Sequence, residues 1–302
     1  MQLKELAQTG VFLPEIGIGL SGYRAGPQVL RQGIEAGAVF LDTAESYGTE
    51  EVAGEAVRGL RERVFIATKV SPENFRDAAF RRSVDASLRR LRMETIDLLQ
   101  LHQPNPAVPV AETLGAAADL VRAGKVRYLG VSNFSVAQLR EAQAAAGGYG
   151  IVANQVRYNL IDRTIEAEVL PYCQANGITV IAYTPLARGW DRIRDCDPQG
   201  TLEQIARDTG RTPAQIALNW CICKDRVVAI PMSNSAGHLL ENCGASGWRL
   251  TAEQLSRLDT QIHFRHRGRF DRLVRTYTPA GLQPLARRAM KWLPRGLRRR
   301  FT

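Results

Sequence analysis

Short runs of β-branched and other apolar residues alternate with helical patterns from Ile16 onward, at a period of roughly thirty residues. This alternation is typical of repeated strand–helix units and predicts a parallel sheet. The predicted strands are Ile16–Leu20, Val39–Asp42, Val64–Val70, Ile96–His102, Val126–Ser132, Val152–Gln155, Thr179–Tyr183 and Val227–Pro231. Predicted helices between them include Phe75–Leu91, Val110–Ala123, Val136–Ala145 and Glu166–Asn176. Before the first strand, two short runs about a Thr9-Gly10 turn predict a small hairpin.

Eight strands in strict alternation with helices favour an α/β fold of the closed (β/α)8 TIM barrel type. An open doubly wound sheet is the alternative, and it usually carries a Gly-rich phosphate loop after its first strand. Gly17, Gly19 and Gly22 match the spacing of that loop, but no acidic residue follows at a suitable distance. We therefore expect one barrel domain over residues 1–262. Its remaining predicted helices are Thr201–Asp208, Pro213–Cys223 and Thr251–Ile262.

The composition is that of an ordinary soluble globular protein, with 45% hydrophobic and 23% charged residues among 302. The first ten residues lack the apolar stretch of a secretory signal, and no run approaches the ~18 apolar residues of a membrane span. The five cysteines form no C-x-x-C pair and show no metal-ligand spacing. We therefore expect a cytoplasmic protein with buried, reduced thiols and with neither a disulfide nor a metal site.

Polar residues occupy the ends of successive predicted strands, where a buried strand has no structural need of them. Asp42, Lys69 and His102 end three consecutive strands, and Tyr47 follows the first of them by five residues. Each alone has an ordinary explanation, such as a turn cap, a solvated ammonium or a loop imidazole. In a closed parallel barrel, however, the carboxyl ends of the strands converge on one mouth, where active sites are built. The four side chains are therefore expected to form one proton-transfer site.

The four residue types suit the reduction of a carbonyl group. Hydride addition leaves an alkoxide that must be protonated as it forms. A phenol with a pKa near 10 is a weak acid for this step, and a cation close to it favours the tyrosinate. Lys69 can supply that charge to Tyr47, while Asp42 keeps the lysine charged and oriented. His102 can donate a hydrogen bond to the carbonyl oxygen. No nucleophile–base pair and no paired carboxylates are visible at the mouth, which disfavours acyl and glycosyl transfer.

The order Asp42, Tyr47, Lys69, His102, within "FLDTAESYG", "IATKV" and "LLQLHQP", resembles the catalytic tetrad of the aldo-keto reductases. The resemblance extends over about residues 1–262, and its motifs are highly specific. It implies a barrel that reduces an aldehyde or ketone with NADP(H) or NAD(H), bound without a Rossmann fold. It also implies a set of cofactor contacts. These are Ser132, Asn133 and Gln155 at the carboxamide, Tyr183 stacked on the nicotinamide, Thr184, Leu186 and Gly189 around the pyrophosphate, and Ser233, His238, Glu241 and Asn242 at the adenosine end.

Two positions depart from the pattern of family members that prefer the phosphorylated cofactor. Those members carry a Lys near the end of the last strand and an Arg six residues later, which clamp the adenosine 2′-phosphate. This chain has Met232 and His238 there. Since a phosphate dianion favours fixed cationic donors, we expect weakened discrimination for NADPH over NADH, with Arg188 a candidate substitute.

The expected walls of the substrate pocket follow the first, third and seventh strands. The loops over residues 103–108 and 188–200 are short, which predicts an open pocket tolerant of varied carbonyls. The expected wall residues are Leu20, Tyr23, Phe75 and Trp190.

The net charge of +10 belongs to a basic C-terminal tail, residues 263–302. From residue 265 onward the tail holds twelve Lys and Arg and one acid, a charge of +11, which leaves about −1 for the rest. Apolar residues recur at helical spacing along it, with arginines opposite. The tail is expected either to lie on the barrel or to contact an anionic membrane or a protein partner. The alternative function is a non-catalytic, cofactor-binding regulatory subunit that docks through this tail. No nucleic-acid recognition module is visible.

Overall fold

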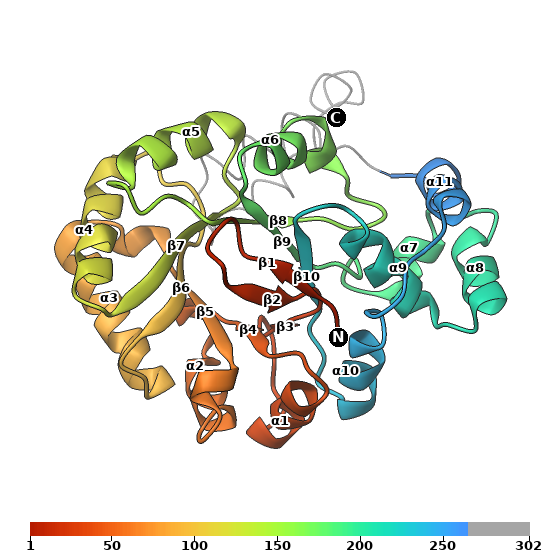
Figure 1. Ribbon diagram of the computed structural model, residues 1–302, viewed down its shortest axis with the longest axis horizontal. Helices are drawn as coiled ribbons and strands as arrows, with labels where there is room; N and C mark the ends of the chain where they lie inside the picture. The colour runs from red at the N-terminus through yellow and green to blue at the C-terminus, as the bar shows by residue number, and fades with distance from the viewer. Residues whose placement is uncertain (265–302) are drawn as a thin grey trace, which may run out of the picture.

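Eight parallel strands form one sheet in a computed structural model that describes residues 1–264 (Figure 1). Their order in the sheet is their order in the sequence, from β3 to β10. A bridge between Ile16 and Ala229 joins the first strand to the last, with the Gly17 N–H donating to the Ala229 carbonyl at 2.8 Å. The predicted (β/α)8 barrel is confirmed. The strands are β3 (Ile18–Gly19), β4 (Phe40–Asp42), β5 (Phe65–Val70), β6 (Ile96–Leu101), β7 (Val126–Ser132), β8 (Ala153–Arg157), β9 (Thr179–Tyr183) and β10 (Val227–Ile230).

Helices surround the strands on the outside of the barrel (Figure 1). Four of them, α1, α2, α7 and α10, were not among the helices predicted from the sequence. They are short, with 9, 7, 5 and 8 residues. The helices are α1 (Pro27–Glu35), α2 (Glu50–Ala56), α3 (Asp77–Leu91), α4 (Val110–Arg122), α5 (Val136–Ala145), α6 (Val169–Ala175), α7 (Trp190–Arg194), α8 (Thr201–Thr209), α9 (Pro213–Ile222), α10 (Ala236–Cys243) and α11 (Ala252–Gln261).

The predicted hairpin is confirmed and lies across the centre of the strand ring (Figure 1). Its strands, β1 (Leu3–Glu5) and β2 (Phe12–Pro14), pair antiparallel. Leu6 and Leu13 are fully buried and pack with residues of the strand interior such as Phe40. The hairpin therefore closes the barrel at the end opposite the mouth with an apolar layer, whose free energy comes from burying nonpolar surface.

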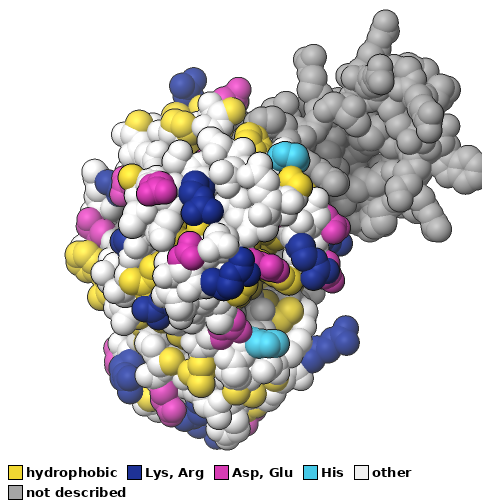
Figure 2. Space-filling view, turned by 90° about the vertical axis from the view of Figure 1, so that its right-hand side faces the viewer, with side chains coloured by type: hydrophobic (Ala, Val, Ile, Leu, Met, Phe, Trp, Pro, Cys, Tyr) yellow, Lys and Arg dark blue, Asp and Glu magenta, His cyan; other side chains and the backbone are white. Residues whose placement is uncertain are grey.

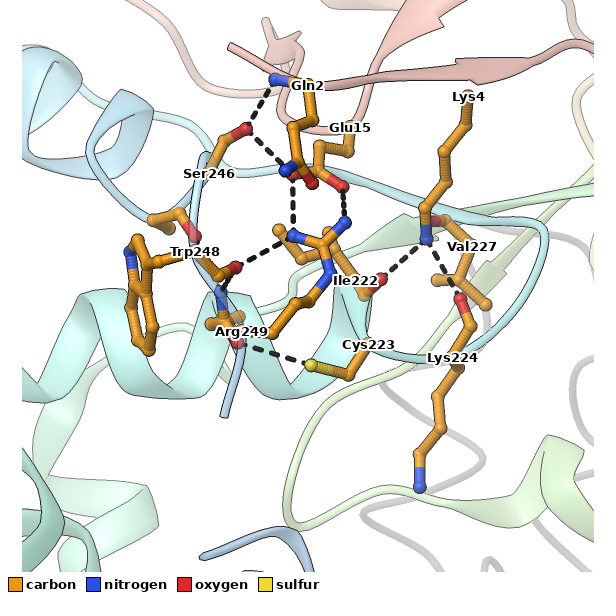
Figure 3. Close-up of polar contacts among 12 residues, drawn as sticks. Gln2, Lys4, Glu15, Ile222, Cys223, Lys224, Val227, Ser246, Trp248 and Arg249 are labelled. Atoms are coloured by element: carbon orange, nitrogen blue, oxygen red, sulfur yellow. Dashed lines mark hydrogen bonds and ion pairs between the residues drawn. The ribbon is translucent and has the colours of Figure 1, made fainter. Parts of the chain in front are cut away.

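A buried carboxylate fastens the hairpin side of the barrel to the segment after α10 (Figure 3). Glu15 is fully buried and accepts two hydrogen bonds from Arg249, at 2.5 and 3.0 Å. The Ser246 hydroxyl donates to Glu15 at 2.7 Å and accepts from the Gln2 N–H at 2.9 Å. A bidentate arginine and a hydroxyl satisfy a buried carboxylate that would otherwise be costly.

Acidic and basic side chains are interspersed on the face of the molecule shown in Figure 2. None of the helices within residues 1–264 has both the length and the apolar character that crossing a membrane requires. The predicted amphipathic segments of the tail lie outside the described residues.

Candidate active site

A buried ion pair occupies the mouth of the barrel. Asp42 ends β4, and Lys69 lies in the neighbouring strand β5. Lys69 Nζ donates to Asp42 Oδ1 at 2.5 Å and to the Thr43 carbonyl at 2.8 Å. The Lys69 and Asp42 side chains are 0% and 3% exposed, so the pair is withdrawn from water. An ammonium in such a place needs an anionic partner, because an unpaired buried charge is very costly.

The environment of Lys69 keeps its ammonium protonated. Burial by itself acts to lower the pKa of Lys69, while Asp42 and then Tyr47 act to raise it. The net direction of the pKa is upward, because the carboxylate is in hydrogen-bond contact with the ammonium. Lys69 therefore carries its charge at neutral pH.

Tyr47 and His102 reach the same point from two different segments. Tyr47 ends the 3-10 helix Glu45–Tyr47, and His102 directly follows β6. The Tyr47 hydroxyl lies 3.2 Å from His102 Nε2, and the two rings meet edge to face. Lys69 Nζ lies 4.9 Å from the centre of the Tyr47 ring. An acid, an amine, a phenol and an imidazole are thus in contact at one point.

His102 is held in its neutral form. Burial disfavours the imidazolium, and the charge of Lys69 repels it, which together lower the pKa of His102 to about 3. A neutral imidazole carries one N–H. His102 can therefore donate one hydrogen bond at the mouth without placing a second cation beside Lys69.

Glu45 anchors the loop that carries Tyr47. Its Oε1 accepts from the Ser71 N–H at 2.6 Å and from Asn74 Nδ2 at 3.0 Å, and its Oε2 accepts from the Ser83 hydroxyl. These bonds fix the loop after β4 against the segment after β5. The sequence analysis did not single out Glu45, although its place between Asp42 and Tyr47 in "DTAESYG" could have drawn attention to it.

Two buried amides complete the contacts of Asp42. Gln100 Nε2 donates to Asp42 Oδ2 at 3.0 Å, and Gln155 Nε2 donates to the same oxygen at 2.8 Å. Gln155 also donates to Gln100 Oε1 at 3.2 Å. Gln100 was missed by the sequence analysis. Its signal is an amide two residues before His102 in an otherwise apolar strand, "DLLQLH", and hence on the same face of the strand.

The side chains expected at the nicotinamide lie at adjacent strand ends. Ser132 ends β7, Gln155 lies in β8 and Tyr183 ends β9. Asn133 connects them, since its Nδ2 donates to Ser132 Oγ at 2.9 Å and its Oδ1 accepts from the Tyr183 hydroxyl at 2.8 Å. The region offers amide and hydroxyl groups beside one aromatic face, which suits a carboxamide-bearing ring.

The turn after β9 combines a buried hydroxyl with strained backbone. Thr184 Oγ1 is buried, and no partner for it occurs among residues 1–264. Four residues of the turn have positive φ: Thr184 (49°), Ala187 (57°), Arg188 (66°) and Gly189 (147°). Two N–H groups of the turn bond inside it, since Ala187 donates to the Thr184 carbonyl at 2.9 Å and Gly189 to the Leu186 carbonyl at 3.0 Å. Strained backbone of this kind gathers at functional sites.

The residues expected at the adenosine end lie after β10 and on α10. Ser233 is buried, whereas Met232 is 41% exposed and His238 is exposed in the first turn of α10. Glu241 is half-buried and Asn242 is buried on the same helix. The two positions that depart from the family pattern are therefore accessible to a ligand phosphate.

The expected pocket walls are mostly part of the core. Leu20, Tyr23 and Phe75 are at most 5% exposed and belong to the main hydrophobic cluster. Trp190 begins α7 and packs against that cluster while partly exposed. Among these four, Trp190 presents the most surface to solvent.

The cysteines and the other metal-ligating residue types form no further site among residues 1–264. Within residues 1–264 no group of three or more His, Cys, Asp or Glu side chains is placed to hold a metal ion. All five cysteines are free thiols, and burial raises the pKa of Cys173 and of Cys221 to about 12.

The sequence model of the "Aldo/keto reductase family" matches residues 27–262. The methylglyoxal reductase YeaE of Escherichia coli (strain K12) is 36% identical over 270 residues, which cover 86% of this chain and 95% of that protein. The aldo-keto reductase YhdN of Bacillus subtilis (strain 168) is 29% identical over 86% of this chain and 93% of its own.

Solved structures agree with these matches. The crystal structure of the thermostable aldo-keto reductase Tm1743 with the inhibitor epalrestat superposes with a TM-score of 0.80 at 39% identity, over 86% of this chain and 100% of that one. An aldo/keto reductase of Klebsiella pneumoniae in complex with NADP and acetate superposes with a TM-score of 0.79 at 37% identity, over 85% and 94% of the two chains. The chain therefore belongs to the aldo/keto reductase family, and it is an NAD(P)H-dependent carbonyl reductase.

Proposed function

We propose that Tyr47 is the proton donor in the reduction of a small aldehyde or ketone by this protein. The observation that carries the proposal is the contact of its hydroxyl with His102 Nε2, at 3.2 Å, beside the Lys69 ammonium 4.9 Å from the ring centre. When bound, the reduced nicotinamide supplies a hydride to the carbonyl carbon. Tyr47 gives its proton to the developing alkoxide, so that hydride and proton together complete the alcohol.

Lys69 and Asp42 act on the phenol rather than on the substrate. As the proton leaves, the tyrosinate forms beside a fixed ammonium in a site of low polarity, where the attraction is strong. Asp42 keeps that ammonium charged and in place. His102 is neutral and directs its N–H to the carbonyl oxygen, which orients the carbonyl and stabilises negative charge on it.

The cofactor is proposed to follow the strand ends from β7 to β10. The amide and hydroxyl groups of the β7 and β8 ends would hold the carboxamide, the ring at the end of β9 would stack on the nicotinamide, and the turn after it would hold the pyrophosphate. The residues in these roles are Ser132, Asn133, Gln155, Tyr183, Thr184, Leu186 and Gly189, followed by Ser233, His238, Glu241 and Asn242 at the adenosine end.

The substrate is proposed to be a small carbonyl compound that enters beside Trp190, with Leu20, Tyr23 and Phe75 behind it. Methylglyoxal is the first compound to test, because the related Escherichia coli protein is a methylglyoxal reductase. A small oxo-aldehyde also suits walls that are already packed into the core.

Turnover of a carbonyl panel by wild type and Tyr47→Phe tests the function. We expect wild type to oxidise reduced cofactor, and Tyr47→Phe to lose about 10²–10⁴-fold in kcat because it has no proton to give. Tyr149→Phe, which changes an exposed tyrosine, is the matched control and should retain wild-type turnover. Equal turnover by wild type and Tyr47→Phe would remove the proposed role, and no turnover by either would favour a binding protein.

We also propose that the cofactor preference is relaxed. Met232 and His238 supply no fixed cation to an adenosine 2′-phosphate, and Arg188 is the proposed partial substitute. The loss of two such donors should cost about 1–3 kcal/mol of preference for NADPH.

Residues 263–302 are proposed to form a functional segment distinct from the barrel over 1–262. The proposal rests on the +11 charge of residues 265–302 and on their amphipathic spacing. Such a segment can bind an anionic membrane surface or an acidic partner without altering the site.

A further inference from the structure

We propose that Gln100 is a positioning residue of the active site, whose amide holds the Asp42 carboxylate in the orientation that binds Lys69. The inference rests on the proposed function of the Asp42, Lys69 and Tyr47 side chains. It adds to them a residue that touches neither the proton donor nor the expected position of the substrate.

The barrel is built to place the Gln100 amide beneath the ion pair. Gln100 is fully buried in β6, and its Cα lies opposite that of Lys69 in the pairing of β5 with β6. Its Nε2 donates to Asp42 Oδ2 at 3.0 Å. On the other side, Gly130 of β7 leaves room for the side chain, since a Cβ there would come within 3.2 Å of Gln100 Cγ.

The two carboxylate oxygens of Asp42 accept hydrogen bonds from different residues. Oδ1 accepts from Lys69, while Oδ2 accepts from both Gln100 and Gln155. Both N–H groups of Gln155 are engaged, one on Asp42 and the other on Gln100 Oε1. Under the proposed function Gln155 also serves the cofactor. Gln100 is the one of the two amides that has no proposed contact with the cofactor, so its hydrogen bond to Oδ2 serves the ion pair alone.

Loss of this hydrogen bond would act on Tyr47 through the ion pair. A buried carboxylate oxygen that loses one of its two donors is held less firmly and can rotate, and the ammonium follows it because the two are in contact. As Tyr47 gives its proton to the alkoxide, the tyrosinate forms beside this ammonium. A less closely held ammonium stabilises the tyrosinate less, which slows the chemical step.

The first test is a comparison of kcat and KM between Gln100→Met and wild type. Methionine keeps the length of the side chain and removes the donor. We expect kcat to fall at least about tenfold, with little change in KM for the carbonyl, because Gln100 does not touch the substrate.

The second test is Gln100→Glu, which gives a signature that damage to the fold cannot mimic. A protonated Glu at this position can donate to Asp42, but an ionised one would repel it. We expect partial recovery of kcat at low pH and a steep loss as the new carboxyl ionises, which adds an ionisation absent from the wild-type profile.

Asn219→Leu is the matched control, because it removes another fully buried amide, one that bonds to Ala245 and Trp248 away from the mouth. It should lower Tm and leave the pH profile of kcat unchanged. A kcat for Gln100→Met and a pH profile for Gln100→Glu that both match wild type would overturn the inference. If Tyr47→Phe nevertheless abolishes turnover, the proposed function survives that failure, whereas turnover by Tyr47→Phe would remove both.

Discussion

Buried charges at the barrel mouth are compensated residue by residue. Lys69 has a carboxylate and a carbonyl as acceptors, and Asp42 has an ammonium and two amides as donors. His102 adds no further buried charge, because its imidazole stays neutral. The sequence predicted the residue types at the strand ends. It did not reveal the amide of Gln100, because a polar residue inside an apolar run has no assigned partner until the strands are side by side.

Cofactor preference is proposed to depend on two residues, Met232 and His238. We expect the ratio of kcat/KM for NADPH to that for NADH to be below about ten in wild type. The double variant Met232→Lys with His238→Arg should raise the ratio by about 10- to 100-fold, because it supplies the cationic donors that a phosphate dianion favours. Steady-state kinetics with both cofactors measure it. A preference of tenfold or more that survives His238→Ala and Arg188→Ala would contradict the prediction.

At the scale of elements, the strand–helix period located all eight strands, and the helices named from it end close to the predicted positions. Gly124 and Gly177 follow the ends of α4 and α6, and their φ values of +74° and +68° show why glycine suits these positions. The predicted helix Glu166–Asn176 is interrupted. Thr164–Ala167 is a 3-10 helix, and α6 begins only at Val169, because Glu168 leaves the helical conformation.

Lys4 connects the hairpin to the end of α9 (Figure 3). Its Nζ donates to the carbonyls of Ile222, Lys224 and Val227 at 2.5, 2.9 and 2.8 Å. A cation suits the carbonyl end of a helix. Burial nevertheless lowers the pKa of Lys4 to about 8, although the carboxylate of Glu15 acts in the opposite direction.

The pKa of Lys4 predicts a pH dependence of stability. Between about pH 8 and 10.5 the unfolded chain still binds this proton while the folded protein has lost it, so the free energy of unfolding rises with pH. We expect the difference in unfolding free energy between wild type and Lys4→Met to grow by up to about 3 kcal/mol over this range. Urea unfolding at three pH values measures it, and Lys224→Met, which changes the side chain of a residue whose backbone carbonyl accepts from Lys4, should follow wild type. A constant or falling difference would contradict the assignment.

At the scale of the whole molecule, the barrel interior is divided into two layers. The hairpin and residues such as Phe40 form an apolar layer at one end, and Asp42, Lys69 and Gln100 form a polar layer at the mouth. Gly17 and Gly19 belong to this packing rather than to a phosphate loop. A Cβ at either would come within 2.7 Å of a neighbouring atom, Phe40 Cδ1 or the Ile230 carbonyl oxygen.

The proposed role of the tail belongs to this scale. We expect the full chain to float with vesicles of anionic phospholipid, and a chain truncated after His263 to remain in solution, because the tail holds twelve Lys and Arg. Neutral vesicles serve as the control, and raised salt should release the full chain. Equal flotation of the two chains would exclude membrane binding by the tail. Unchanged kcat after truncation would show that the barrel acts without it.

The sequence by itself determined the barrel, its hairpin and the four residues at its mouth. These features are local, because strand spacing, a turn and a polar residue at a strand end can all be read within a few positions. Only the tertiary structure decided which side chains contact one another at the mouth. Gln155 reaches Asp42 across 113 residues, and the Ile16–Ala229 bridge closes the ring. The neutral state of His102 depends on burial and on the charge of a residue from another strand. Contacts of this kind depend on distances across the barrel, which exist only after the chain has closed.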